Sequence, residues 1–251
     1  MDRERLAAQL KKSDLEDLIQ DSTWIRSYEI SADTVLRVLE PIENPEGGVA
    51  RVFRVDTPMG QKALRIDFAH AVGNRSIGFI LHIFLSRAGI TPKMHGYLDG
   101  ESLTLLMRSH SSLATIRTPW PEYPNAAPIS AQILDIVPDG WNVLRTQKPS
   151  RTPAAIHRWD FDKILWEVRF IQDTLRRLDI QLLDPQFLIC SEGSVQLIDL
   201  EHCLFIDSQE NYWAYAGLET ARYKEWVSHR REIRNDYTQA VLSELVMRRD
   251  T

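Results

Sequence analysis

The chain has 251 residues, of which 43% are hydrophobic and 26% charged, and its formal net charge is −5. This is the composition of an ordinary folded protein with room for one large domain or two small lobes, and it excludes a low-complexity chain. The acidic balance argues against a broad nucleic-acid-binding surface, so no nucleic-acid partner is expected. The net charge does not exclude a local basic cleft.

The N-terminal residues carry charge from the second position onward and contain no apolar core of the signal-peptide type. Within them, residues 4–20 place apolar side chains at helical spacing among charges, which predicts an amphipathic helix. The longest apolar stretch of the chain, residues 77–85, is too short to span a bilayer. We therefore expect a cytoplasmic protein without a membrane span, and secretion by a route that needs no cleaved signal stays open.

Strand patterns follow the first helix. Alternation of apolar and polar residues predicts three strands, at 34–42, 48–57 and 61–68. A Pro/Gly turn at 57–60 joins the last two strands. Because the connections are short, we expect an antiparallel meander.

A helix and a further hairpin complete the first part of the chain. Residues 74–89 have helical periodicity, and Gly89 is the expected C-terminal stop. Residues 93–107 are interpreted as a strand, an Asp99-Gly100 turn and a second strand. Residues 1–107 are thus predicted to form an N-terminal helix followed by a sheet-rich lobe.

The middle of the chain differs in composition. Residues 118–153 hold seven of the twelve prolines, which is typical of a connector or a long irregular insertion. We predict that residues 108–158 connect two lobes. A proline-rich ligand for an SH3-like partner is the alternative interpretation of this segment.

The last part, residues 159–251, is predicted to be a mainly helical lobe. Residues 159–178 carry a helical apolar stripe, and the aromatic-rich residues 211–249 are also predicted to be helical. Cys190 and Cys203 lie in apolar surroundings and form no C-x-x-C pair. They indicate buried free thiols rather than a disulfide framework or a structural zinc site.

A hairpin flanked by acids lies within this lobe, in "LLDPQFLICSEGSVQLIDLEH" (182–202). Two apolar runs, 187–190 and 195–198, are separated by a turn-like Ser-Glu-Gly-Ser. Asp184 precedes the hairpin and Asp199 follows it. Taken alone, Asp184 fits a turn and Asp199 fits the end of a strand, since aspartate is common at both.

The order of these elements resembles the protein-kinase-like fold, found in protein kinases and in aminoglycoside and choline phosphotransferases. The resemblance covers most of residues 34–205. It implies an α+β fold with two lobes: an antiparallel sheet with one long helix, then a mainly helical lobe. The "IDLE" sequence at 198–201 is similar to the I-D-F-E of small-molecule kinases.

Spacing assigns the hairpin residues by this resemblance. With Asp199 placed on the aspartate of D-F-G, Gly193 falls on the hairpin glycine and Gln186 on the metal-binding asparagine without a gap. The resemblance implies that Asp199 and Gln186 hold Mg²⁺, a hard cation that takes oxygen ligands and bridges phosphates. The two ends of one hairpin would bring these side chains to one point.

Two departures from the family concern catalysis and the nucleotide. The position of the catalytic aspartate is Gln181, so Asp179 or Asp184 is a candidate base only if the loop is shifted. In the sheet-rich lobe, Arg65 replaces the usual lysine, and no acid occurs between residues 67 and 99 to pair with it as the helix glutamate would. Arg and Lys are not equivalent at a phosphate site.

The glycine-rich loop is degraded as well. Aligned on Val52, only Gly47 of its glycines survives. By the resemblance, the candidate nucleotide-binding residues are therefore Gly47, Gly48 and Arg65.

We accordingly predict a kinase-like protein with degenerate catalytic motifs, acting as a pseudokinase-type binding or regulatory module for an unidentified protein partner. ATP and Mg²⁺ are the cofactors that the resemblance implies, and whether this chain keeps either stays open. One alternative is an active atypical kinase, with Asp199 and Gln186 on Mg²⁺, Arg65 on phosphates, and Asp184 or Asp179 as base. Another is an unrelated α+β effector or partner-binding protein.

Overall fold

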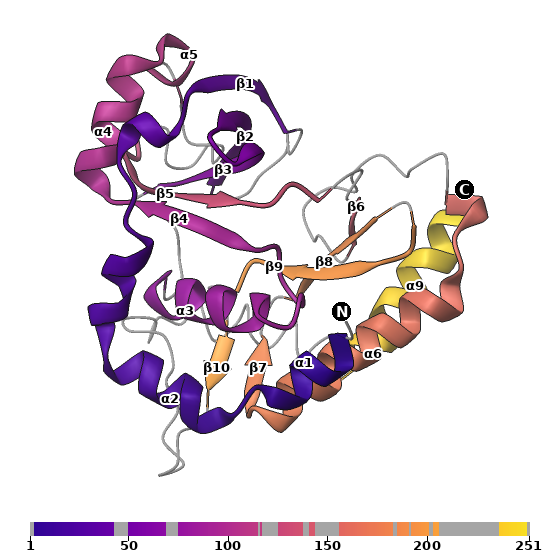
Figure 1. Cartoon of the computed structure of the whole chain (residues 1–251). Helices are drawn as coiled ribbons and strands as arrows, with labels where there is room; N and C mark the ends of the chain where they lie inside the picture. Colours follow the sequence, from indigo (N-terminus) through magenta and orange to yellow (C-terminus); the bar gives the residue numbers. More distant parts are fainter. Residues whose placement is uncertain are drawn as a thin grey trace. The chain divides into compact units, whose positions relative to one another are not determined.

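The structure is a computed structural model that describes residues 3–42, 50–68, 75–114, 116, 125–137, 141–143, 156–182, 185–190, 192–200, 203–205 and 236–249. The described chain is α+β, with a five-stranded antiparallel sheet, two smaller sheets and helices (Figure 1). It divides into two compact units. One contains Met1–Gln20, Gly73–Pro92 and Val137–Thr251, and the other contains Asp21–Val72 and Lys93–Ile136.

The second unit is built on the five-stranded sheet, with strand order β1-β2-β3-β5-β4 and every neighbouring pair antiparallel. Its strands are β1 (Arg37–Pro41), β2 (Ala50–Thr57), β3 (Gly60–Phe68), β4 (Met94–Leu98) and β5 (Pro128–Leu134). Short 3₁₀ helices, η1 (Ser22–Tyr28) and η2 (Ala32–Thr34), precede the sheet in sequence. The predicted antiparallel meander of the first three strands is confirmed.

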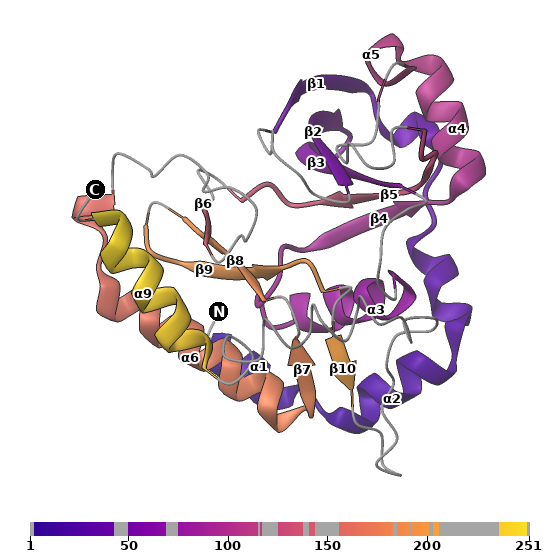
Figure 2. The same ribbon diagram turned by 180° about the vertical axis from the view of Figure 1, so that it is seen from behind.

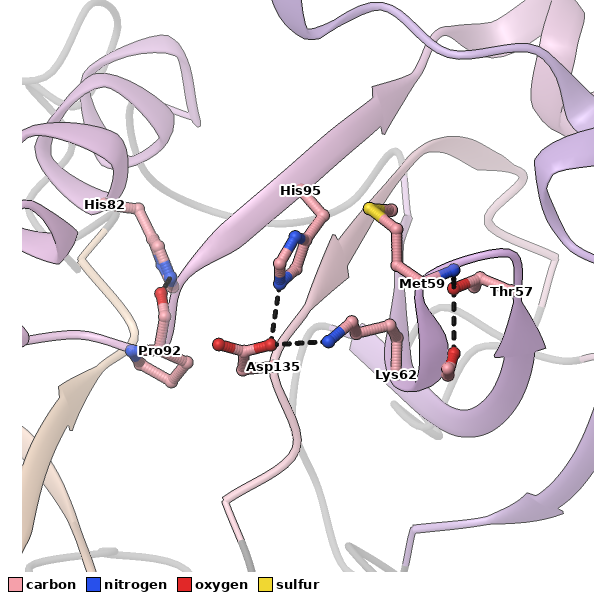
Figure 3. Close-up of polar contacts among 8 residues, drawn as sticks. Thr57, Met59, Lys62, His82, Pro92, His95 and Asp135 are labelled. Carbon is pink, nitrogen blue, oxygen red and sulfur yellow. Dashed lines mark hydrogen bonds and ion pairs between the residues drawn. The ribbon is translucent and has the colours of Figure 1, made fainter.

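The turn between β2 and β3 is fixed by a small set of hydrogen bonds (Figure 3). The Thr57 hydroxyl donates to the Gly60 carbonyl at 2.8 Å and accepts from the Met59 amide at 3.1 Å. Gly60 has φ +88°, a conformation that favours glycine. These contacts set the register of the hairpin, from Thr57 opposite Gly60 to Ala50 opposite Asp67.

Two helices supply much of the apolar cover of this unit: α4 (Gly100–Ser109) and α5 (Ser111–Ala114). Their buried leucines belong to one core cluster with sheet residues: Val35, Val55, Leu64, Ile66, Phe68, Leu98, Leu103, Leu106, Leu113, Ala131 and Ile133. Burial of such side chains is worth about 1.5–3 kcal/mol each by area. The core of this unit therefore lies between the sheet and these helices.

Two predictions for this unit are wrong. Residues 93–107 are not a strand hairpin: the first strand forms as β4, but Asp99 then caps a helix, and its carboxylate accepts from the Ser102 amide at 2.8 Å. The proline-rich segment is not only a connector, because it supplies β5, which pairs with both β3 and β4. Ala131 and Ile133 of β5 are fully buried where the strand lies between β3 and β4.

The first unit contains the remaining helices and two small sheets. Its helices are α1 (Arg3–Gln9), α2 (Lys12–Gln20), α3 (Arg75–Ser86), η3 (Ile156–Arg158), α6 (Phe161–Arg177) and α9 (Tyr237–Arg249). Its strands are β6 (Trp141–Val143), β7 (Ile180–Leu182), β8 (Gln186–Ile189), β9 (Val195–Ile198) and β10 (Cys203–Phe205). They form a three-stranded sheet, β6-β8-β9, and a pair, β10-β7.

The helix predicted at 4–20 is wrong as a continuous element, since it is two helices that break after Gln9. The reason is a tertiary contact: the Arg177 guanidinium donates to the carbonyls of Ala7 and Leu10, at 2.6 and 2.8 Å. A cation there interacts favourably with carbonyls at the end of a helix, where the Ala7 carbonyl also accepts from the Leu10 amide at 3.0 Å. The helix predicted at 74–89 is confirmed as α3, and Gly89 follows it with φ +68° in a Schellman-type stop.

The long helix α6 packs against α9, which lies alongside it in both views (Figures 1 and 2). Asp160 caps α6 by accepting from the Lys163 amide at 3.0 Å, and the predicted apolar stripe is buried. The Gln172 side chain accepts from the Tyr237 amide at 2.9 Å, which ties the start of α9 to α6. The helical prediction for the tail is confirmed over α9, and residues 211–235 lie outside the described residues.

Among the described helices, none is long and apolar enough to cross a membrane.

Candidate functional site

The acid-flanked hairpin forms as predicted, from β8 and β9. The two strands pair antiparallel, with Gln186 opposite Ile198 and Ile189 opposite Val195. Gly193, at φ +77°, closes the turn, and its amide donates to the Cys190 carbonyl at 2.8 Å. The Cys190 amide in turn donates to the Ser194 carbonyl at 2.9 Å. This closed turn fixes the separation of the two ends of the hairpin.

Gln186 and Asp199 meet at those ends. Because Gln186 is opposite Ile198, the next residue, Asp199, lies beside the Gln186 side chain. The Gln186 Nε2 atom donates to Asp199 Oδ2 at 2.7 Å, and both residues are half-buried. The expected convergence of these two side chains is therefore confirmed, while their role as metal ligands stays a prediction.

Asp199 has an unusual backbone conformation. Its φ is +62°, in the left-handed region, which costs energy for a residue with a Cβ atom. Aspartate tolerates this region better than most residues, and such conformations cluster at functional sites. The left-handed residue directs the chain away from β9 at the point where its carboxylate meets Gln186.

A third side chain, Asn142 of β6, completes what we call the hairpin triad: Asn142, Gln186 and Asp199. Asn142 is opposite Leu188 in the β6–β8 pairing, and its Nδ2 atom donates to Gln186 Oε1 at 2.8 Å. Sequence reasoning missed Asn142 because it lies in the proline-rich segment. The alternation Trp141-Asn142-Val143, with buried flanks around a half-buried amide, was the available signal of a strand.

The donor set of the triad does not fit Mg²⁺ as it stands. Mg²⁺ requires oxygen ligands, and only the Asp199 carboxylate offers one toward the contact, since Gln186 directs its nitrogen there and its oxygen to Asn142. In the part of the chain that the structure describes, no group of three His, Cys, Asp or Glu side chains could hold a metal ion.

The candidate bases differ in what the structure describes. Asp184 lies outside the described residues. Asp179 follows α6 with φ +55° and forms an ion pair with Lys12, Nζ to Oδ2 at 2.7 Å. It precedes β7, whereas the connection to Gln186 leaves the other end of that strand. Asp179 therefore ends a helix and anchors α2, and it is not brought to the triad.

Gln181, at the position of the missing catalytic aspartate, is a half-buried residue of β7. Its strand pairs with β10, with Leu182 opposite Cys203. One small sheet contains β7 and β10, and the other contains β8 and β9. The β7–β8 connection and the β9–β10 connection therefore each join these two sheets. Asp199 begins the second of these connections.

Arg65 belongs to the other unit, where its charge is compensated within its own strand. Its Nε atom lies 3.1 Å from Asp67 Oδ1, and Asp67 is only 2% exposed. Gln132 Nε2 donates to the second oxygen of Asp67 at 3.2 Å. Residues two apart in a strand share a face, so Arg65 and Asp67 can pair within β3. The other nucleotide-binding candidates, Gly47 and Gly48, lie outside the described residues.

Three further titratable side chains form what we call the sheet cluster: Lys62, His95 and Asp135 (Figure 3). Asp135 Oδ1 lies 2.9 Å from Lys62 Nζ and 2.6 Å from His95 Nε2. Burial raises the pKa of the Asp135 carboxyl, but the hydrogen bonds from Lys62 and His95 outweigh it and hold that pKa below its ordinary value. Sequence reasoning missed this cluster, because β5 was not predicted and only its pairing with β3 and β4 brings the residues together.

Comparison with known proteins gives no family assignment. No protein-family model matches the chain, and no curated protein matches it. The geometry of the hairpin triad and of its neighbours is therefore the basis for a functional proposal.

Proposed function

We propose that the chain is a kinase-like protein with degenerate catalytic motifs, which acts as a pseudokinase-type binding or regulatory module for a protein partner. The observation that carries the proposal is the contact of Gln186 with Asp199 at the ends of one hairpin, with Gln181 at the position of the catalytic carboxylate. Loss of a positioned acid–base group costs about 10²–10⁴-fold in rate, so phosphate transfer is not expected.

The order of elements supports the kinase-like part of this proposal. In the sequence, α3 lies between β3 and β4, which are two strands of the antiparallel sheet. A long helix, α6, then leads through β7 to the β8–β9 hairpin, and Asp199 directly follows that hairpin.

The ion pair between Arg65 and Asp67 supports the proposal that the catalytic motifs are degenerate. A phosphate-contacting cation needs its charge directed at the ligand, whereas Arg65 is paired with the buried Asp67. Extracting Arg65 from this contact would remove a cation from a buried carboxylate, which is costly. Nucleotide binding that depends on Arg65 is therefore not part of the proposed function.

The test is phosphate transfer and ATP hydrolysis measured with labelled ATP and Mg²⁺, comparing the wild type with Asp199→Ala. We expect both proteins to give the same background rate. ATP turnover by the wild type that Asp199→Ala abolishes would refute the degenerate assignment. A protein captured by the chain counts as a partner only if the two purified proteins bind each other directly.

One observation favours a second candidate, an active atypical kinase that uses Asp199. The left-handed backbone of Asp199 is strained, and strain of this kind is kept where a side chain must be held in place. The same labelled-ATP comparison decides between the two candidates, because only the active kinase loses turnover in Asp199→Ala.

A further inference from the structure

The carboxylate of Asp199 determines how the amide of Gln186 is oriented. A carboxylate oxygen accepts hydrogen bonds and does not donate them, so the Gln186 atom 2.7 Å from Asp199 Oδ2 has to be the nitrogen. An amide oxygen at that distance would face another oxygen and be repelled. The two orientations of a glutamine amide are nearly equal intrinsically, so its neighbours decide between them.

The same reasoning extends one step further, to Asn142. With its nitrogen toward Asp199, Gln186 directs its Oε1 atom to Asn142, which donates from Nδ2 at 2.8 Å. If Asn142 presented its oxygen instead, the two amide oxygens would face each other. The chain of donors from Asn142 through Gln186 to Asp199 is therefore the arrangement in which each contact within the triad joins a nitrogen to an oxygen.

The β6 backbone holds Asn142 in this place. Trp141 and Val143 on either side are 5% and 1% exposed, and β6 pairs with β8 over all three of its residues. Asn142 is opposite Leu188, so Gln186 is its diagonal neighbour on the same face, within reach of two amide side chains. The backbone of Asn142 is thus fixed by strand pairing and packing that do not involve Asp199.

We infer that Asn142 is a positioning residue that holds the Gln186 nitrogen toward Asp199 and thereby closes this pair of side chains to Mg²⁺. A cation could use both side chains only after Gln186 turned its oxygen inward and its nitrogen toward Asn142. Asn142 would then have to turn as well and present its own oxygen. The inference rests on the proposed function only in taking the end of the hairpin as the ligand site.

The test measures Mn²⁺ binding, by loss of the free-ion electron paramagnetic resonance signal, with no nucleotide present. The wild type is expected to bind no Mn²⁺ in an Asp199-dependent way at millimolar concentration. In Asn142→Asp, the residue at position 142 presents only oxygens to Gln186. The Gln186 nitrogen should then turn toward position 142, and the Gln186 oxygen should turn toward Asp199. Partners that orient a ligand typically change metal affinity about 10–100-fold, so Asn142→Asp should bind Mn²⁺ at least about tenfold more tightly.

Three further variants separate orientation from charge and from folding. Gln196→Glu adds the same charge on β9, opposite Leu188 from the other side, and should bind no Mn²⁺. Asn142→Leu keeps the branched shape without donor or acceptor, and should show weaker but detectable binding even if Asn142→Asp does not fold. Gln186→Glu places two carboxylates together and is the positive control. Adding Asp199→Asn to any binding variant should abolish its binding.

Several results would overturn the inference. One is Asp199-dependent Mn²⁺ binding by the wild type. Another is equal binding by Gln196→Glu and Asn142→Asp, since charge alone would then explain the gain. A third is no gain in either Asn142 variant, whether or not Gln186→Glu binds. Because the titration contains no nucleotide, its outcome is independent of the labelled-ATP assay, so each proposal can fail without the other.

Discussion

Two aspartates with left-handed backbones show how surroundings separate a structural residue from a candidate site residue. Asp179 and Asp199 have φ values of +55° and +62°. Asp179 is nearly half-exposed and pairs with Lys12, a role that any helix end can use. Asp199 is joined through Gln186 to Asn142, within a sheet whose register determines the contact. The two residues have similar backbone strain. Their side-chain partners are what distinguish Asp179 as a structural residue from Asp199 as a candidate site residue.

At the same scale, the sheet cluster should make stability depend on pH. The pKa of Asp135 is lower in the folded chain than its ordinary value of 3.8, so its contribution is fully present above that pH. The contribution is lost as the pH falls through the lower, folded-state pKa. Because Asp135 is partly exposed, screening limits the effect, and Asp135→Asn should cost only about 0.5–1 kcal/mol at pH 7.

The measurement is urea unfolding of the wild type and Asp135→Asn between pH 7 and pH 3. The difference between the two proteins should shrink as the pH falls below 3.8. A difference that does not change with pH would show that the ionised carboxylate contributes nothing.

At the scale of elements, residues 100–109 show why a hairpin was predicted where a helix forms. The sequence Leu98-Asp99-Gly100 contains a Gly-containing turn signal, but Asp99 is also a good helix cap. The following residues alternate poorly, and Leu103 and Leu106 are buried three residues apart. Spacing of three between buried residues is helical, and a short segment of this length carries too few periods to decide from sequence.

This difference gives a direct test, because a strand places residues two apart on one face and a helix does not. Leu103 is 1% exposed and Leu105 is 52% exposed. Leu103→Ala should cost about 2–5 kcal/mol of unfolding free energy, whereas Leu105→Ala should change it by less than about 0.5 kcal/mol. Chemical denaturation of both variants measures the two costs, and similar costs would contradict the helix.

At the scale of the whole chain, contacts distant in sequence join the N-terminal helix α1 to the hairpin. Within the first unit, Arg3 of α1 pairs with Glu167 of α6, and its Nη2 atom donates to the Val195 carbonyl of β9 at 2.9 Å. Burial raises the pKa of Glu167, and the charge of Arg3 offsets part of that increase. One N-terminal residue therefore connects the long helix to the candidate site's hairpin.

Removing Arg3 should expose this dependence. Arg3→Met leaves the Glu167 carboxylate half-buried without its cation and should cost about 1–3 kcal/mol. Arg3→Met combined with Glu167→Gln should recover part of that loss, because no charge is then left uncompensated. Thermal and urea unfolding of the two single variants and the double variant form the cycle, and simple additivity would argue that the ion pair carries no coupling.

The sequence alone determined the elements whose signals are local. The β1–β3 strands, α3 with Gly89, α6 and the β8–β9 hairpin follow from periodicity, turns and caps, which depend on residues a few positions apart. The convergence of Gln186 and Asp199 belongs to the same class, because one tight turn sets it. Tertiary structure decided the rest: the break after α1, the place of β5 between β3 and β4, the sheet cluster, and Asn142. Each depends on residues tens to more than a hundred positions apart, and no local pattern contains the pairing that brings them together.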